Sequence, residues 1–269
     1  MIEAWLLLAV LGFMAAVMNL AWLFQRQVGN TGWVDVFWTL GTGLAGVAVA
    51  LYPLQDGPWP TQRQLLVASL VAVWAARLGA YVTRRVATSS EDARYVAFRK
   101  TWGPGYQSTL FWFLQPQALV TALLCLSIAL AARRPDPGLG VQDLTGAAIL
   151  IVAIVGEAIA DRQLARFKAA NRENGGICDR GLWAWSRHPN YFFEWFGWLA
   201  YPVIAVDLAR PVTWLSIAGP LVMYGVLRFL TGVPPLERSM LASRGERFHT
   251  YQARTSVFFP LPPRQGAAA

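Results

Sequence analysis

Charged residues are scarce in this chain. They make up 14% of its 269 residues, whereas a soluble globular domain carries about 25%. Together with a hydrophobic share of 55%, this shortage excludes a water-soluble domain, a disordered chain and a collagen-like repeat.

Cysteine and lysine are also rare. Cys125 lies in an apolar run and Cys178 in a basic loop, so we expect no disulfide between them, and no spacing suggests a metal site. Lys100 and Lys168 are the only lysines, and the other 21 of the 23 basic residues are arginines. Arginine suits bidentate recognition of phosphate or carboxylate, although a GC-rich genome produces the same bias.

The apolar residues that are present come in long runs, such as Leu65–Ala76 and Ala118–Ala132. A helix needs about 20 apolar residues to cross a bilayer, and the runs predict an all-α, polytopic integral membrane bundle of about seven transmembrane helices. The expected spans are Ala4–Phe24, Trp33–Pro53, Gln64–Thr83, Leu110–Ala131, Leu144–Leu164, Tyr191–Val206 and Val212–Thr231.

Basic residues are unevenly shared between the two sets of loops. Arg84–Thr109, Ala165–Asn190 and the tail after Gly232 carry five Lys or Arg each, whereas the loops on the other side carry four arginines in total. Positive loops stay in the cytoplasm, so we expect the N-terminus outside and the C-terminus in the cytoplasm. This distribution favours membrane topology over nucleic-acid binding as the reason for the net charge of +8. No internal repeat interrupts the chain, and we expect one domain over residues 1–269.

Polar and ionisable side chains inside the expected spans gather in their cytoplasmic halves. They are Asn19, Asp35, Arg77, Tyr81, Glu157, Asp161, Glu194 and Arg228. Such residues are costly in a membrane and are candidates for a functional site. Interhelical ion pairs explain the depth of each residue in the membrane. They do not explain why positively and negatively charged residues gather on the same side of the membrane. We therefore predict a polar cavity open to the cytoplasm.

The most specific stretch of the sequence is Gly181–Trp195, which reads Gly-Leu-Trp-Ala-Trp-Ser-Arg-His-Pro-Asn-Tyr-Phe-Phe-Glu-Trp. Pro189 favours the first turn of a helix, and the free N–H groups of such a turn attract anions. Arg187 and His188 precede that turn as further donors to a phosphate. Composition alone also fits a Trp-rich interfacial anchor.

This stretch resembles the C-terminal domain of the steroid 5-alpha-reductase family, in particular its bacterial branch. The similarity covers residues 156–260 and includes the closing segment Tyr251–Pro260, whereas the N-terminal half matches only in outline. The resemblance implies seven transmembrane helices that enclose NADPH from the cytoplasmic side, and hydride transfer to an activated C=C bond. It also implies a place in a bacterial inner membrane and in lipid metabolism.

The resemblance and the anion-binding turn together assign nine residues to the cofactor. The end of the fifth span contributes Glu157, Asp161 and Lys168. The signature contributes Arg187, His188, Asn190, Tyr191 and Glu194, and the last span contributes Arg228. By this resemblance Asn190 and Glu194 contact the nicotinamide half, and Arg228 lies beside the phosphates. Glu157 departs from the eukaryotic members, which carry an amide there.

The catalytic end departs further from the family, because the second span lacks the Gln-Glu pair of the steroid enzymes. We expect Asp35 to replace the acid, Tyr81 to donate to the enolate-like oxygen that follows hydride transfer, and Arg77 to set the local field. Trp74 is the alternative to Tyr81. Burial in the bilayer favours a protonated Asp35, and no metal is expected.

Two other functions fit part of the sequence. The Arg-His-Pro-x-Tyr segment also resembles S-adenosylmethionine-dependent isoprenylcysteine and phospholipid methyltransferases. Those enzymes usually carry a Glu-Glu pair further on, where this chain has only Glu237 followed by Arg238. A haem- or lipid-binding scaffold is the third interpretation, but His188 and His249 lie outside the expected spans. For the reductase we expect a lipophilic substrate from the surrounding membrane lipids, with no nucleic acid and no obligate protein partner.

Overall fold

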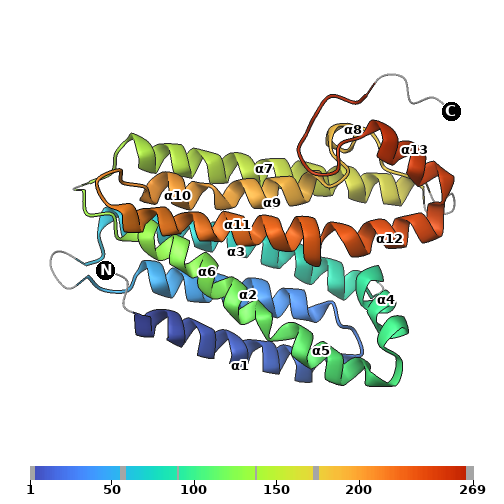
Figure 1. Cartoon of the computed structure of the whole chain (residues 1–269), viewed down its shortest axis with the longest axis horizontal. Coiled ribbons are helices and arrows are strands. Elements are labelled where there is room, and N and C mark those ends of the chain that lie inside the picture. The colour runs from blue at the N-terminus through green and yellow to red at the C-terminus, as the bar shows by residue number, and fades with distance from the viewer. Residues whose placement is uncertain (1–3, 55–58, 90, 137, 172–175, 265–269) are drawn as a thin grey trace. The chain divides into compact units, whose positions relative to one another are not determined.

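The computed structural model describes residues 4–54, 59–89, 91–136, 138–171 and 176–264. Within these ranges the regular structure is helical, and the β-pairing is limited to an isolated bridge between Ser186 and Ser256. The predicted all-α membrane bundle is confirmed (Figure 1).

The helices follow one another along the chain with short connections. In order they are α1 (Ala4–Val28), α2 (Trp33–Ala50), α3 (Gln62–Thr88), α4 (Ala93–Trp102), η1 (Gly103–Gly105), α5 (Tyr106–Leu114), α6 (Pro116–Ala132), α7 (Val141–Ala170), α8 (Leu182–Trp185), α9 (Pro189–Trp198), α10 (Ala200–Ala205), η2 (Pro211–Ile217), α11 (Ala218–Gly225), η3 (Val226–Leu230), α12 (Val233–Arg244) and α13 (Glu246–Arg254).

Six helices or continuous helical runs in the described ranges are long and apolar enough to cross a membrane. They are residues 4–28, 33–50, 62–88, 94–132, 141–170 and 211–244. The segment expected as the sixth of seven spans, Tyr191–Val206, instead forms the two short helices α9 and α10. Pro202 explains the break, because it has no N–H to donate to the carbonyl of Trp198, where α9 ends.

The chain divides into two compact units. Unit 1 comprises residues 1–148 and 199–222, and unit 2 comprises residues 149–198 and 223–269. The three candidate catalytic residues belong to unit 1 and the nine candidate cofactor residues belong to unit 2. That residues 1–269 act as one domain stays a prediction.

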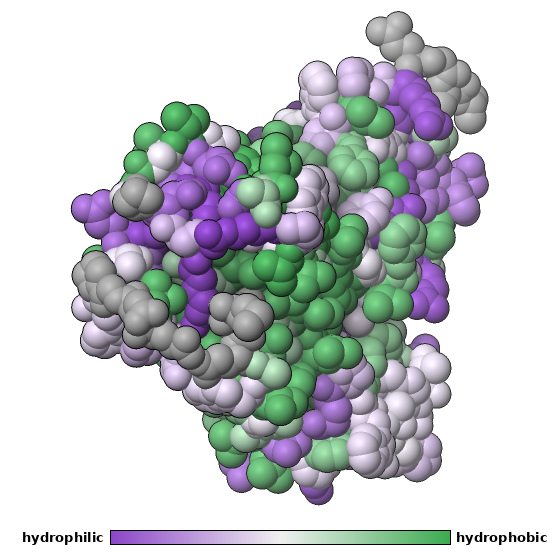
Figure 2. Space-filling view, turned by 60° about the vertical axis from the view of Figure 1, so that its left-hand side comes forward, coloured by the Kyte–Doolittle hydropathy of each residue, from purple (hydrophilic) through white to green (hydrophobic). Residues whose placement is uncertain are grey.

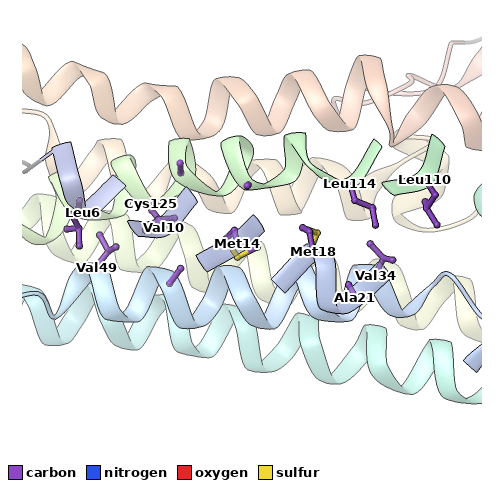
Figure 3. Packing of buried hydrophobic residues seen from close by; sticks show 14 of the residues in the cluster. Leu6, Val10, Met14, Met18, Ala21, Val34, Val49, Leu110, Leu114 and Cys125 are labelled. Atoms are coloured by element: carbon purple, nitrogen blue, oxygen red, sulfur yellow. The ribbon is translucent and has the colours of Figure 1, made fainter. Parts of the chain in front are cut away.

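The core of unit 1 forms where α1 packs against α2, α5 and α6. Leu6, Val10, Met14, Met18 and Ala21 recur every three or four residues and therefore share one face of α1. Figure 3 shows this row beside side chains from α2, α5 and α6, which are Val34, Val49, Leu110, Leu114 and Cys125.

The contact between α2 and α3 depends on small residues. A Cβ atom added at Gly43 would lie 2.3 Å from the Cβ atom of Ala75, so the two backbones are too close for any larger side chain at that position. Lipid tails are as apolar as the helix surfaces, and close packing through small residues is how helices associate in a bilayer. The glycine-rich second span is therefore a packing surface.

Large apolar side chains also cover much of the exterior. Leu44, Trp112 and Leu144 are 67%, 69% and 64% exposed, values that suit contact with lipid but not with water. On the face of the molecule drawn in Figure 2, hydrophobic side chains cover a broad area and hydrophilic side chains gather in separate groups. This surface agrees with an integral membrane protein.

Candidate functional site

A polar cluster of unit 2 is centred on Glu237 of α12. Arg187 donates to both of its carboxylate oxygens, from Nε at 2.7 Å and from Nη2 at 3.2 Å. Gln252 of α13 donates from Nε2 at 2.8 Å, and Nε2 of His188 lies 3.1 Å from Oε1. We call these four residues the Glu237 cluster.

The Glu237 cluster is held in place by a pairing of two extended segments. Ser186 forms a bridge with Ser256, its hydroxyl donates to the carbonyl of Phe258 at 2.7 Å, and the amide of Arg187 donates to the carbonyl of Ser256 at 2.8 Å. The Arg187 guanidinium also donates to the carbonyl of Thr255 at 2.6 Å. Arg187 therefore fastens the C-terminal segment to the start of α9, and its predicted contact with a cofactor phosphate stays a prediction.

Helix α9 begins at Pro189, as the sequence predicts. Its first turns carry Asn190, Tyr191 and Glu194. The ring of Tyr191 stacks on that of His188 with centroids 5.5 Å apart, and the indole N–H of Trp198 donates to Glu194 at 2.9 Å. The side chains around the first turn of α9 are thus held in place, and the start of a helix attracts anions.

His188 is buried, and its surroundings shift the pKa of its imidazole. Burial lowers its pKa from the ordinary value, the hydrogen bond and charge of Glu237 partly offset this, and the nearby charges of Arg187 and Arg228 lower it further. The imidazole is therefore neutral near pH 7. Its ring and the guanidinium of Arg228 are close enough for their charges to interact, although they come from separate segments of unit 2.

Arg228 lies on an irregular turn of the last long helical run. Residues Val226–Leu230 form the π-helical segment η3, in which the amide of Thr231 donates to the carbonyl of Val226 at 3.0 Å. Such π turns are frequent at functional sites. In the described ranges no carboxylate lies within ion-pair distance of Arg228, and its guanidinium carbon lies 5.1 Å from the ring centroid of Phe229.

The remaining cofactor candidates of unit 2 lie on α7. Glu157 and Asp161 are buried and Lys168 is exposed. The same helix holds the signature segment, because the indole N–H of Trp183 donates to the carbonyl of Ala160 at 3.0 Å and the amide of Leu182 donates to Gln163 at 3.0 Å. Helix α7 thus carries both buried carboxylates and also holds the signature segment through these hydrogen bonds.

The sequence did not reveal the roles of two side chains in α13. Tyr251 donates from its hydroxyl to the carbonyl of Trp183 at 2.5 Å, and Gln252 completes the Glu237 cluster. Burial raises the pKa of Tyr251 above its ordinary value, so this hydroxyl stays a donor. The closing segment Tyr251–Pro260 was recognised as part of the family resemblance, but its residue types give no sign of these partners.

Asp35 of unit 1 accepts bonds from residues that the sequence did not single out. Tyr95 donates to it at 2.8 Å and Arg94 at 2.8 Å, and Arg85 lies 3.6 Å away. Two hydrogen bonds and one further guanidinium therefore hold the Asp35 side chain in place, and its role as the catalytic acid stays a prediction.

Asp92 belongs to the same ion-pair group and caps α4. It accepts from the amide of Arg94 at 3.0 Å. Although burial alone raises the pKa of Asp92, the charge and hydrogen bonds of Arg94 lower it to about 2. The Asp92 carboxylate therefore stays charged at neutral pH. The ion-pair group fastens α4 to the start of α2, because Arg94 also pairs with Asp35.

Arg77 and Tyr81 are neighbours on α3, with the guanidinium carbon 5.4 Å from the ring centroid. Tyr81 also packs against a small cluster of valines, Val36, Val82 and Val86. The structure brings these two candidate catalytic residues together, while Asp35 belongs to the ion-pair group of Arg94. Their catalytic roles stay predictions.

Comparison with known proteins points to one family. A family model described as "Protein of unknown function (DUF1295)" matches residues 21–255. A relative, the "Uncharacterized protein C594.04c" of Schizosaccharomyces pombe, is 24% identical over 266 residues, which cover 90% of this chain and 76% of that protein. No solved structure matches this chain.

Proposed function

This chain belongs to the family described as "Protein of unknown function (DUF1295)", and we propose that it is an integral membrane, NADPH-dependent reductase of lipid metabolism. In this proposal hydride is added to an activated C=C bond of a lipophilic substrate, such as a steroid-like, isoprenoid or fatty acyl molecule, in a bacterial inner membrane. The resemblance of Gly181–Trp195 to the steroid 5-alpha-reductase family suggests the reaction.

The observation that carries the proposal is the charge balance around Arg228. Glu237 is matched by Arg187, and His188 is neutral near pH 7. Among the described residues Arg228 has no carboxylate partner, so its positive charge in an apolar helical run is compensated best by a bound anion. A phosphate group of NADPH supplies that charge and accepts two parallel N–H bonds from a guanidinium.

The other residues of unit 2 fit the rest of such a ligand. The first turn of α9 offers N–H groups to a second phosphate, and the buried carboxylates Glu157 and Asp161 are acceptors for ribose hydroxyls. Bound NADPH would supply the hydride, and the protein would supply orientation and exclusion of water. In unit 1, Tyr81 is our candidate donor to the oxygen that gains negative charge, with Arg77 stabilising that charge.

Ligand titration tests the proposal against the methyltransferase alternative. Purified full-length protein in detergent is titrated with NADPH and with S-adenosylmethionine, and the thermal unfolding midpoint and NADPH fluorescence are recorded. We expect stabilisation by NADPH, which amounts to about 2.7 kcal/mol at 100 times Kd, and none by S-adenosylmethionine. Arg228→Gln should weaken NADPH binding by about tenfold or more, because a charge-assisted bidentate contact is lost.

The matched control is Arg238→Gln, which removes an exposed arginine from α12 and should leave NADPH affinity unchanged. Stabilisation by S-adenosylmethionine alone would support the methyltransferase. Equal NADPH affinity in the wild type and Arg228→Gln would contradict the role given to Arg228.

A further inference from the structure

His188 is a buried titratable side chain whose chemistry the proposed reaction does not use. It stands directly before Pro189, the first residue of α9, and is 7% exposed. Its backbone amide donates to the hydroxyl of Ser186 at 3.1 Å, and its ring stacks on that of Tyr191 with an interplanar angle of 9°. These two contacts hold the backbone and the plane of the imidazole in place.

Glu237 determines which ring nitrogen of His188 carries the proton. Nε2 lies 3.1 Å from Oε1 of Glu237, and the same carboxylate accepts from Arg187 at 2.7 Å and from Gln252 at 2.8 Å. An ionised carboxylate can only accept hydrogen bonds, so the proton of this contact belongs to Nε2. The lowered pKa of His188 keeps the ring neutral near pH 7. In a neutral imidazole the other nitrogen, Nδ1, is then an acceptor without a proton.

This acceptor has no hydrogen-bond donor within the chain. In the described ranges the hydrogen bonds of His188 involve its backbone and Nε2, and none reaches Nδ1. Burying an acceptor without a donor costs free energy, and buried polar atoms are nearly always satisfied by protein, water or a ligand. The charge of Arg228 acts on the same ring, so the acceptor belongs to the surroundings in which the proposed function puts a cofactor phosphate.

We propose that Nδ1 of His188 accepts a hydrogen bond from an O–H or N–H group of the bound cofactor and so orients it. This inference rests on the proposed function. It gives His188 the opposite role to the phosphate donor that the sequence suggests, because the lone pair on Nδ1 repels the oxygens of a phosphate. NADPH carries both kinds of group. Its phosphates suit the guanidinium of Arg228, and its ribose hydroxyls, adenine amine and carboxamide are donors for Nδ1.

Nitrogen NMR of the full-length protein in lipid bilayers tests the position of the proton. The chain has two histidines, so labelling histidine with nitrogen-15 gives the signals of two rings, and the variant His249→Gln assigns those that remain to His188. At pH 7 we expect a protonated Nε2 and an unprotonated Nδ1, whose resonance shifts when NADPH is added. A proton on Nδ1 would overturn the proposal whether or not NADPH binds.

Two substitutions separate the acceptor from the contact with Glu237. The amide of His188→Asn lies near the position of Nδ1 and can present an oxygen there, whereas the amide of His188→Gln reaches the position of Nε2 and replaces only the contact with Glu237. We expect His188→Gln to weaken NADPH binding by about threefold to tenfold, as for the loss of one neutral hydrogen bond, and His188→Asn to bind more tightly than His188→Gln. A purely structural role would reverse this order. His249→Gln changes an exposed ring on α13 and should bind NADPH like the wild type.

The same titrations with 2′-phospho-ADP-ribose, which lacks the nicotinamide ring, locate the donor on the cofactor. Equal weakening of this fragment and of NADPH in His188→Gln assigns the donor to a hydroxyl or amine of the fragment, and weakening of NADPH alone assigns it to the carboxamide. Equal NADPH affinity in the wild type, His188→Gln and His188→Asn would overturn the acceptor role and leave the proposed function intact. Absence of NADPH binding by the wild type would contradict the proposed function, and this inference with it.

Discussion

The electrostatics of unit 2 are decided by a few side chains around one carboxylate. Glu237 faces Arg187 and His188, and Arg228 acts on the same imidazole. If His188 were charged as well, three cations would surround one anion. Burial and both guanidinium groups oppose that state, so His188 is neutral and serves as a hydrogen-bond donor to Glu237.

This balance predicts that stability depends on the protonation of His188. Its pKa is lowered in the folded protein, so as the pH falls through the ordinary value of about 6.5 the unfolded chain takes up a proton that the folded chain resists. The stability is complete above that pH and is lost below it, with a slope of at most about 1.4 kcal/mol per pH unit. We expect the thermal unfolding midpoint of the wild type to decrease when the pH is lowered from 7.5 to 5.5. In His188→Gln we expect a smaller decrease.

The second histidine provides the comparison. His249 on α13 is exposed, and His249→Gln should keep the wild-type slope. Equal slopes for the wild type and His188→Gln would show that other groups cause the pH dependence.

At the scale of the elements, a buried cluster of two arginines and one aspartate joins α3, the end of α6 and α7. Asp143 is completely buried and accepts from Arg63 at 2.8 Å and from Arg134 at 2.8 Å. Arg63 also donates to the carbonyls of Arg134 at 2.6 Å and Gly138 at 2.6 Å. The Asp143 carboxylate holds both guanidinium groups of this cluster.

We therefore expect Asp143→Asn to destabilise the protein by about 3–5 kcal/mol, because it removes the buried negative charge that Arg63 and Arg134 share. The free energy of unfolding in detergent measures this loss. Asp136→Asn is the matched control. Its carboxylate also pairs with Arg134, at 2.7 Å, but is 58% exposed, and exposed pairs contribute at most about 1 kcal/mol. Similar losses in both variants would contradict the explanation by burial.

The elements also show what the sequence predicts well. Apolar length identified the long spans, and Pro189 identified the start of α9, because both signals are local. The break at Leu199 was missed, since the apolar run continues through it although Pro202 removes a helical hydrogen bond. The partners of Asp35 were missed for another reason. Arg94 and Tyr95 are 59 and 60 residues away along the chain, and no local pattern indicates which distant polar residues meet.

At the scale of the whole molecule, the basic loops determine how the chain crosses the membrane. Most of the positive charge lies in Arg84–Thr109, Ala165–Asn190 and the tail after Gly232, and we predict that these segments lie on the cytoplasmic side. The last helical run, residues 211–244, then ends in the cytoplasm and begins outside. This requires Pro189–Ala205 to cross as well, even though α9 and α10 are individually short. Their 17 residues together are the lower limit for a span.

Cysteine labelling tests this topology. In a variant without Cys125 and Cys178, which are both buried, we expect Asp207→Cys to react with a membrane-impermeant maleimide added to intact cells, because it follows α10 on the outer side. Arg247→Cys, on the exposed side of α13, should react only after the membrane is opened. If α9 and α10 instead returned to the cytoplasm, Asp207→Cys would be protected in intact cells. The last helical run would then have to end outside, with the five arginines of the tail, against the charge rule that the other loops obey.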